Sequence, residues 1–182
     1  VFGGTGYTGV ELIRLLLNHP NVEIYQITSR NDKGKRADEI YPSFRGVLNN
    51  ILVSPEDADL KNVDIVFFAT PNGIAMNYAE GLIEAGKLVI DLAADFRIKD
   101  QGIWEKWYGV EHKSPNLINK AVYGLPEINR DSIKKSKLVA NPGCYPTAIQ
   151  LALIPLLEKK LISSTNIIAD AKSGISGAGR NP

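Results

Sequence analysis

Residues 2–12 read FGGTGYTGVEL, in which Gly4, Gly6 and Gly9 have the spacing Gly-x-Gly-x-x-Gly. Apolar residues then recur at helical spacing over residues 8–17, which predicts a helix directly after the turn. In a strand–turn–helix unit, such glycines allow a tight turn, close approach of the backbone to a pyrophosphate, and packing of helix on strand. Free N–H groups at the start of the helix favour a bound phosphate. Glycine spacing alone is a weak signal, but this context predicts a dinucleotide-binding turn.

Five consecutive residues of this turn are the expected cofactor contacts: Gly4, Thr5, Gly6, Tyr7 and Thr8. No Gly-Lys-Ser or Gly-Lys-Thr sequence follows the glycines. The absence of that sequence disfavours the phosphate-binding loop of an NTPase.

The end of the next expected strand, residues 22–28, indicates which dinucleotide binds. Ser29 and Arg30 follow this strand directly. An NAD site usually has an acidic residue here for the ribose 2′-hydroxyl, whereas an NADP site tends to have an arginine. A hydroxyl and a guanidinium suit a 2′-phosphate through charge-assisted hydrogen bonds. We therefore predict NADP as the cofactor; the alternative is that Arg30 is a solvated surface residue.

Short apolar runs alternate with helix-like segments along the chain. The expected strands are residues 22–28, 63–69, 88–91 and 138–141, and the expected helices are residues 8–17, 73–85 and 147–159. This alternation predicts an α/β fold, a Rossmann-type doubly wound and mostly parallel sheet. Residues 94–137 give no clear pattern.

A domain boundary is expected close to Cys144, because no linker interrupts the chain. The expected units are an NADP-binding Rossmann domain over residues 1–145 and the start of an α+β catalytic and dimerisation domain over residues 146–182. Both are expected to be truncated. Only two residues precede the glycine turn, whereas a typical strand has about five or six. The chain also ends within a glycine-rich loop, residues 173–182.

The composition is that of an ordinary globular domain. Of the 182 residues, 44% are hydrophobic and 23% are charged, which excludes disordered and fibrous classes. The formal net charge of +1 offers no basic surface for nucleic acid, and no apolar run is long enough to span a membrane. The single cysteine, Cys144, cannot form an internal disulfide, which favours a reducing compartment. We expect a cytoplasmic protein; a plastid stays open because a leader would precede this sequence.

The sequence ANPGCYPT, residues 140–147, lies between an expected strand and an expected helix. At a helix start, the dipole and the free amides favour thiolate over thiol, so Cys144 is a candidate nucleophile. The alternative is a small buried hydrophobic residue, which most free cysteines are. Catalysis is favoured because open α/β sheets bind ligands at the carboxyl ends of their strands.

The two histidines lack the spacing of a metal site. His19 precedes a proline at a helix end and is expected at the surface, and His112 lies in a Lys-rich loop. We therefore expect no metal.

The chain resembles the N-acetyl-gamma-glutamyl-phosphate reductase family, the arginine-pathway members of the semialdehyde dehydrogenase superfamily, over essentially its whole length. The segments that carry the resemblance are GGTGYTG (3–9), TSR (28–30), ATPNG (69–73), DLAADFR (91–97), YGLPE (123–127), NPGCYPT (141–147) and SGISGAGR (173–180). NPGCYPT together with SGISGAGR is highly specific for this family, whereas the glycine turn alone is not.

The resemblance implies roles for several residues. Cys144 would be the catalytic nucleophile, and Ser29 and Arg30 would contact the NADP phosphate. Thr70 and Pro71 would line the cofactor cleft.

Two further pairs have implied positions. Ser173 and Gly174 would approach the nicotinamide. Arg97 and Asn141 are weaker candidates for contacts with the substrate, and structural roles in their loops are the alternative.

The implied reaction is the NADPH-dependent reduction of a small-molecule acyl phosphate, N-acetyl-L-glutamyl 5-phosphate, to N-acetyl-L-glutamate 5-semialdehyde. The Cys144 thiolate would displace phosphate and form a thioester, which hydride then reduces. The family's histidine base lies beyond Pro182, so the 182-residue piece is expected to be inactive. The full protein is expected to be a homo-oligomer, a dimer or a tetramer.

Three alternatives stay open. Aspartate-semialdehyde dehydrogenase shares the cysteine chemistry, but its cysteine usually follows an asparagine directly. A lysine-pathway reductase that acts on a carrier-bound aminoadipyl phosphate is closer. A non-catalytic NADP-binding module is the alternative from a different class.

Overall fold

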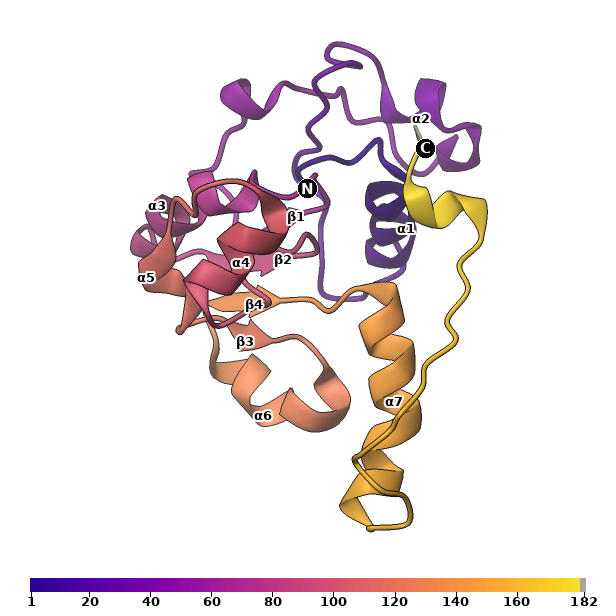
Figure 1. Cartoon of the computed structure of the whole chain (residues 1–182). Helices are drawn as coiled ribbons and strands as arrows, with labels where there is room; N and C mark the ends of the chain where they lie inside the picture. The colour runs from indigo at the N-terminus through magenta and orange to yellow at the C-terminus, as the bar shows by residue number, and fades with distance from the viewer. Residues whose placement is uncertain (181–182) are drawn as a thin grey trace.

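A parallel four-stranded sheet forms the centre of the structure (Figure 1). The computed structural model describes residues 1–180. Its strands are β1 (Ile65–Phe68), β2 (Leu88–Asp91), β3 (Val122–Tyr123) and β4 (Leu138–Ala140), in the spatial order β1-β2-β4-β3. Every strand pair is parallel, and Phe2 adds a parallel bridge to Phe68 on the free side of β1. The predicted α/β fold with a mostly parallel sheet is confirmed.

Helices precede, separate and follow these strands. The α-helices are α1 (Tyr7–Leu16), α2 (Ala37–Ile40), α3 (Ala79–Glu84), α4 (Gln101–Tyr108), α5 (Pro115–Ile118), α6 (Pro126–Lys135) and α7 (Cys144–Glu158). Single 3₁₀ turns occupy Pro42–Phe44, Pro55–Asp57, Ala75–Asn77 and Ile175–Ala178. In the described part of the chain, no helix combines the length and the apolar character needed to cross a membrane.

Two apolar clusters hold these elements together. The first packs helices against the sheet and contains Phe2, Phe68, Val89 and Trp104, all of them buried. The second joins α1 to the segments that follow it and contains Ile13, Ile27, Ala37, Phe44, Leu48 and Leu52. Trp104 is fully buried and its Nε1 donates to the carbonyl oxygen of Ala94 at 2.8 Å, so its polar atom is satisfied.

Several predicted elements lie where the sequence places them. The helix predicted for residues 8–17 is α1, and the strand predicted for residues 63–69 is β1. The strands predicted for residues 88–91 and 138–141 are β2 and β4. These segments combine a clear periodicity with a buried face, which is why their pattern alone identifies them.

The strand predicted for residues 22–28 is only partly correct. The segment is extended, but its one strand-like pairing is a bridge between Thr28 and Val53. Val1 reaches only its end, where the Val1 amino group donates to the carbonyl oxygen of Gln26. The first part of the segment therefore lacks a neighbouring strand.

Two predicted helices have different bounds. The helix predicted for residues 73–85 is divided into a 3₁₀ turn and α3, which begins at Ala79. The helix predicted for residues 147–159 is α7 and begins already at Cys144. Residues 94–137, without a clear sequence pattern, contain α4, α5, β3 and α6, which are short elements fixed by packing on the sheet.

Helix α7 is apolar on all sides, yet none of its residues is buried. Figure 1 shows α7 projecting away from the sheet, with the following segment running back along it towards α1. A helix that is apolar all round is typical of a covered element.

Candidate functional site

At three positions of the glycine turn, Gly3, Gly4 and Gly9, an added Cβ would come within 2.5 Å of another atom, and at Gly3 and Gly9 that atom belongs to the backbone. Gly3 has a left-handed conformation (φ +73°), and a Cβ on it would lie 2.4 Å from the carbonyl oxygen of Ala69. A Cβ on Gly9 would lie 2.3 Å from the carbonyl oxygen of Gly3, so α1 packs directly on the turn. The left-handed residue thus precedes the Gly-x-Gly-x-x-Gly motif, while Gly4 is buried against Ile27.

A pocket of about 210 Å³, here called the cofactor pocket, lies beside this turn. Its lining residues are Phe2, Gly3, Thr5, Thr28, Ser29, Arg30, Asn31, Pro55, Thr70, Pro71 and Ile74. The structure therefore brings together predicted cofactor residues from three separate segments: the turn, the end of residues 22–28, and the loop after β1.

Polar groups in the cofactor pocket fit a dinucleotide. The hydroxyl groups of Thr5 and Ser29 lie 2.9 Å apart, which ties the turn to the neighbouring segment. The Arg30 side chain is exposed at the pocket edge. The hydroxyl of Thr70 is buried and has no hydrogen-bond partner among residues 1–180. A bound polar ligand would satisfy this hydroxyl, since buried polar groups are normally hydrogen bonded.

Asp32 is an acidic residue near the cofactor pocket that sequence reasoning missed. Its N–H donates to the Ser29 hydroxyl at 3.3 Å, and its side chain is largely buried. A hydrogen bond from Lys35, 2.9 Å away, is the main reason that the pKa of Asp32 is lowered. The Asp32 carboxylate is thus paired with Lys35 and also lies 3.8 Å from Nη1 of Arg180. The signal is a Ser-x-x-Asp sequence, typical of a side-chain-capped turn.

A second pocket of about 440 Å³, here called the nucleophile pocket, joins the glycine turn to the cysteine. Its lining residues are Gly6, Tyr7, Thr8, Ala69, Leu92, Arg97, Asn141, Pro142, Gly143, Cys144, Ser176, Gly177, Gly179 and Arg180. The start of α1 and the start of α7 thus face one cavity, although they are far apart in the sequence.

Cys144 is the first residue of α7 and is exposed. Gly143 is the N-cap residue of this helix and has an extended backbone conformation. Its carbonyl oxygen accepts two hydrogen bonds from Thr147, one from the backbone N–H at 3.0 Å and one from the hydroxyl at 2.8 Å. The thiol therefore lies at the positive end of a helix and is accessible from the pocket, as a nucleophile requires.

Arg97 is fixed beside the cysteine by backbone carbonyl groups. Its Nε donates to Asn141, and its Nη2 donates to Leu92 at 2.7 Å. The remaining nitrogen, Nη1, lies 3.2 Å from the position that a Cβ of Gly143 would occupy. The guanidinium therefore both braces the loop before Cys144 and presents a positive charge to the nucleophile pocket.

Asn141 has a position set by the backbone. Its N–H donates to the carbonyl oxygen of Asp91 at 2.8 Å, which continues the pairing of β2 with β4. Its side-chain oxygen lies against Gly124, where a Cβ would come within 2.5 Å. These contacts give Asn141 a structural role in addition to its place on the pocket wall.

Two buried carboxylates shape the loops around both pockets. Asp95 accepts hydrogen bonds from the N–H groups of Gly73 (2.7 Å) and Met76 (3.0 Å), which fixes the loop that carries Thr70. Asp91 accepts from the N–H groups of Ala93 (2.9 Å) and Asp95 (3.2 Å). Burial and the adjacent charge of Asp95 raise the pKa of Asp91 to about 7. Sequence reasoning missed both carboxylates, and the apolar neighbours in DLAADF are the signal for their burial.

The C-terminal loop reaches the site through residues other than those expected. Ser173 and Gly174 are exposed and do not line either pocket. The nucleophile pocket is lined instead by Ser176, Gly177, Gly179 and Arg180, which lie in and directly after the 3₁₀ turn Ile175–Ala178. Arg180 donates to the carbonyl oxygen of Thr5 at 3.3 Å, so this loop closes on the glycine turn.

The two histidines have structural contacts outside both pockets. His19 is exposed, as expected. His112 lies in the loop between α4 and α5, as expected, but it is buried there. Its Nδ1 accepts from the N–H of Ser114, so Nε2 carries the proton that it donates to the carbonyl oxygen of Asp95 at 2.8 Å. Over residues 1–180, no group of three or more His, Cys, Asp or Glu side chains is arranged to hold a metal ion.

A parallel sheet with a glycine turn, and a cysteine that shares a pocket with that turn, define a dinucleotide-binding domain equipped for covalent chemistry. The chain belongs to the semialdehyde dehydrogenase family. Residues 1–136 match the family model for the NAD binding domain, and residues 144–182 match the model for the dimerisation domain.

Curated relatives indicate one branch of this family. The chain is 61% identical over 180 residues to the N-acetyl-gamma-glutamyl-phosphate reductase of Laribacter hongkongensis and 58% identical to that of Thiobacillus denitrificans. Each match covers 99% of this chain and 53% of the relative. The chain thus spans about half the length of these relatives, and the resemblance noted in the sequence is confirmed.

Solved structures support the fold. An aspartate semialdehyde dehydrogenase II from Vibrio cholerae matches 86% of this chain and 45% of its own with a TM-score of 0.64 and 21% identity. Aspartate semialdehyde dehydrogenase from Candida albicans, solved with NADP, matches 87% of this chain and 46% of its own with a TM-score of 0.59 and 18% identity. The Rossmann-type fold is therefore confirmed.

Proposed function

We propose that the longer protein containing this chain is an NADP-dependent N-acetyl-gamma-glutamyl-phosphate reductase in arginine biosynthesis. It converts N-acetyl-L-glutamyl 5-phosphate into N-acetyl-L-glutamate 5-semialdehyde and phosphate. The observation that carries this proposal is the nucleophile pocket, where Gly6, Tyr7 and Thr8 face Cys144 across one cavity. The name shared by the curated relatives supports the substrate.

Cys144 is the nucleophile of the proposed reaction. Its sulfur attacks the acyl carbon, the C–O bond to phosphate breaks, and a thioester remains on the enzyme. Covalent catalysis of this kind divides one difficult displacement into two easier steps. The exposed position at the start of α7 supports this role, because the substrate can reach the sulfur there.

Arg97 is proposed to bind the phosphate of the substrate. Nε and Nη2 are occupied by backbone carbonyl groups, which leaves Nη1 to face the pocket beside Cys144. A guanidinium fixed in advance loses little freedom when it binds an oxyanion, and it neutralises the charge of the departing phosphate. Asn141 holds this guanidinium through its carbonyl oxygen and contributes by positioning.

The cofactor pocket is proposed to bind NADPH. Ser29 and Arg30 would bind the 2′-phosphate, Thr5 and Thr70 would contact the cofactor through their hydroxyl groups, and Pro71 would complete the wall. When bound, NADPH supplies the hydride that reduces the thioester to the aldehyde. The nucleophile pocket is closed over the glycine turn by Ser176, Gly177, Gly179 and Arg180, rather than by Ser173 and Gly174, and these residues help to exclude water.

The structure of α7 also supports proposals for the domain boundary and for the oligomeric state. We place the domain boundary after residue 145, because the buried core ends with β4 and α7 leaves the sheet. The match of residues 144–182 to a dimerisation domain and the uncovered apolar surface of α7 support a homo-oligomer. A cytoplasmic location is proposed because the nucleophile must stay a free thiol.

The test is the reverse reaction with the longer protein. Purified enzyme is mixed with N-acetyl-L-glutamate 5-semialdehyde, NADP and phosphate, and the formation of NADPH is measured by its absorbance. Cys144→Ser is expected to lower the rate at least about a thousandfold while NADPH binding is retained. Full activity of Cys144→Ser would disprove the mechanism. Faster turnover of aspartate semialdehyde or a carrier-bound aminoadipate semialdehyde would disprove the proposed substrate.

A further inference from the structure

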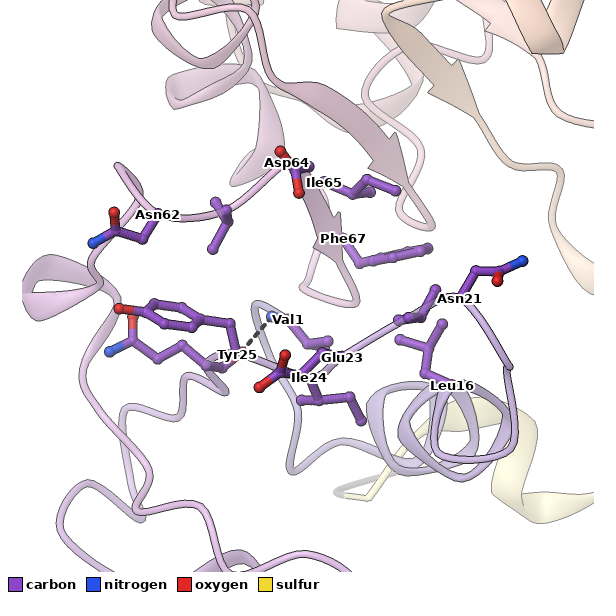
Figure 2. A pocket seen from close by; sticks show the side chains of 13 residues that line it. Val1, Leu16, Asn21, Glu23, Ile24, Tyr25, Asn62, Asp64, Ile65 and Phe67 are labelled. Carbon is purple, nitrogen blue, oxygen red and sulfur yellow. Dashed lines mark hydrogen bonds between the residues drawn. The ribbon is translucent and has the colours of Figure 1, made fainter.

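Figure 2 shows a groove beside β1, with Ile65 and Phe67 on one wall and Ile24 on the other. None of the residues that line the cofactor pocket or the nucleophile pocket lines this groove. The contacts that bear on the proposed chemistry lie instead at the carboxyl ends of β1 and β2, where both strands lead into loops of the site.

Two loops meet at these strand ends. The first, residues 69–74, follows β1, carries Thr70 and Pro71 of the cofactor pocket, and is here called the cofactor loop. The second, residues 92–97, follows β2, ends with Arg97 of the nucleophile pocket, and is here called the arginine loop. Because β1 and β2 are neighbouring parallel strands, the two loops leave the sheet side by side. Their contacts therefore set how the two pockets lie relative to each other.

Three hydrogen bonds join the arginine loop to the cofactor loop and to the 3₁₀ turn that follows it. The buried carboxylate of Asp95 accepts from the N–H of Gly73 at 2.7 Å through one oxygen and from the N–H of Met76 at 3.0 Å through the other. In the opposite direction, the side-chain oxygen of Asn72 accepts from the N–H of Ala94 at 3.1 Å. Each loop thus supplies a side chain that holds the backbone of the other.

Asp95 is itself held in place by its own backbone groups. Its N–H donates to the Asp91 carboxylate at 3.2 Å, and its carbonyl oxygen accepts from Nε2 of His112 at 2.8 Å. Within residues 1–180, the Asp95 carboxylate forms no ion pair. A buried carboxylate needs hydrogen-bond donors to offset its lost hydration, and here the two N–H groups beside the cofactor loop supply them.

We propose that Asp95 is a positioning residue of the reductase reaction, which holds the cofactor loop against the arginine loop. This inference rests on the proposed function. The buried hydroxyl of Thr70 has no partner within residues 1–180 and can serve a cofactor only where the loop places it. Arg97 is fixed at the other end of the arginine loop by its bonds to backbone carbonyl groups. Asp95 therefore keeps the cofactor contact of Thr70 in register with the phosphate contact of Arg97.

The proposed reaction needs the bound cofactor and the thioester to lie within reach of each other. A misplacement of about 1 Å can lower a rate about a hundredfold, even when the changed residue lies away from the reacting atoms. Asp95 touches neither the cofactor pocket nor the nucleophile pocket, since it lines neither of them. Its effect is thus expected on both NADPH binding and turnover, through Thr70 and Arg97.

The test uses the longer protein and compares Asp95→Asn with Asp100→Ala. Asp95→Asn keeps the size of the side chain but replaces one acceptor oxygen by an amide group that cannot accept. We expect NADPH affinity, measured by fluorescence titration, and kcat of the reverse reaction each to fall at least about tenfold. Asp100 accepts from the N–H of Ile103 at the start of α4 and lines neither pocket. Asp100→Ala is expected to lower Tm without changing NADPH affinity or kcat.

Asn72→Ala provides a second variant at an exposed position, so it tests the same contact without disturbing the interior. It removes the hydrogen bond from Ala94 and is expected to weaken NADPH binding about fivefold, in proportion to one hydrogen bond. If Asp95→Asn does not fold, Asn72→Ala decides, and unchanged NADPH affinity in that variant overturns the proposal.

The wild-type protein separates the two levels of inference. If it neither binds NADPH nor turns over, the proposed function fails and the role of Asp95 fails with it. If it is active and folded Asp95→Asn matches it in NADPH affinity and kcat, only the positioning role is wrong. A Tm lowered in Asp95→Asn, with both functional quantities unchanged as in Asp100→Ala, would show a merely structural contact.

Discussion

Arg97 is tied to Asn141 by a hydrogen bond from its Nε to the Asn141 carbonyl oxygen. A second bond from Nη2 to Leu92 prevents the guanidinium from turning. The loop that leads to Cys144 is therefore fixed to the turn that follows β2. One side chain thus links the end of β2 to the loop that leads to Cys144 at the start of α7.

Replacing Arg97 tests whether this bracing matters. Arg97→Lys keeps the charge but cannot donate to both carbonyl groups in the fixed fork of a guanidinium. We expect about 2 kcal/mol lower stability of the chain, and in the longer enzyme a KM for the acyl phosphate raised about tenfold. Arg130→Lys, at an exposed position of α6, is the matched control and is expected to change neither. Unchanged kinetics with Arg97→Lys would disprove the phosphate-binding role.

The choice of NADP over NAD depends on Arg30 in our proposal. Arg30→Ala removes the positive charge at the edge of the cofactor pocket. We expect NADPH affinity to fall about ten- to a hundredfold, with NADH affinity unchanged, because only NADPH has the 2′-phosphate. Fluorescence titration with both nucleotides measures this, and Arg45→Ala, also exposed, is the control. Equal losses for NADPH and NADH would show that Arg30 does not recognise the phosphate.

Gly9 in α1 and Gly81 in α3 form a matched pair that tests how closely α1 packs on the glycine turn. Gly9→Ala would place a Cβ 2.3 Å from the carbonyl oxygen of Gly3. This oxygen belongs to the backbone of the turn, so it cannot move away without a change in the turn itself. We expect a loss of about 3 kcal/mol of unfolding free energy. Gly81→Ala in α3 meets no atom within 4 Å and is expected to stabilise by about 0.5–1 kcal/mol. Urea unfolding of both variants measures the difference; similar stabilities would contradict the close packing of α1 on the turn.

The local parts of the fold were predictable from the sequence, and the parts that depend on distant partners were not. The helix at residues 8–17 and the glycine turn combine periodicity with a specific backbone requirement. The segment 22–28 has a strand-like sequence, but its pairing depends on the distant residues Val1 and Val53. The short elements between residues 94 and 137 depend on packing around Trp104, which no local pattern records.

The candidate site shows the same distinction. Apart from the buried Gly4, the predicted residues of the turn line two pockets together with the Ser29–Arg30 pair and Cys144, because each lies at the end of a secondary-structure element. The hydrogen bonds of Asp95 were not predictable from the sequence, since its partners Gly73 and Met76 belong to another loop. The motif predicts Ser173 and Gly174 at the site, whereas the fold of the loop brings Ser176, Gly177, Gly179 and Arg180 to the pocket.

Asp91 predicts a pH dependence of stability. Its pKa is raised from 3.8 to about 7, chiefly by burial and then by the charge of Asp95, while hydrogen bonds from Ala93 and Asp95 and the charge of Arg97 act in the opposite direction. Between these two values the folded chain binds more protons at this site than the unfolded chain. Stability therefore falls as the pH rises from about 4 to about 7, and this contribution is constant above the folded pKa.

Asp91→Asn removes this titration while an amide oxygen still accepts one of the two backbone hydrogen bonds. We expect the variant to lose the part of the slope of unfolding free energy against pH that Asp91 contributes between pH 4 and 7. The absolute stability also changes, because one N–H loses its acceptor, so the slope is the informative quantity. Urea unfolding at a series of pH values measures it, with Asp131→Asn in exposed α6 as the control. If the wild-type and Asp91→Asn slopes coincide, Asp91 is ionised in the folded chain well below pH 7.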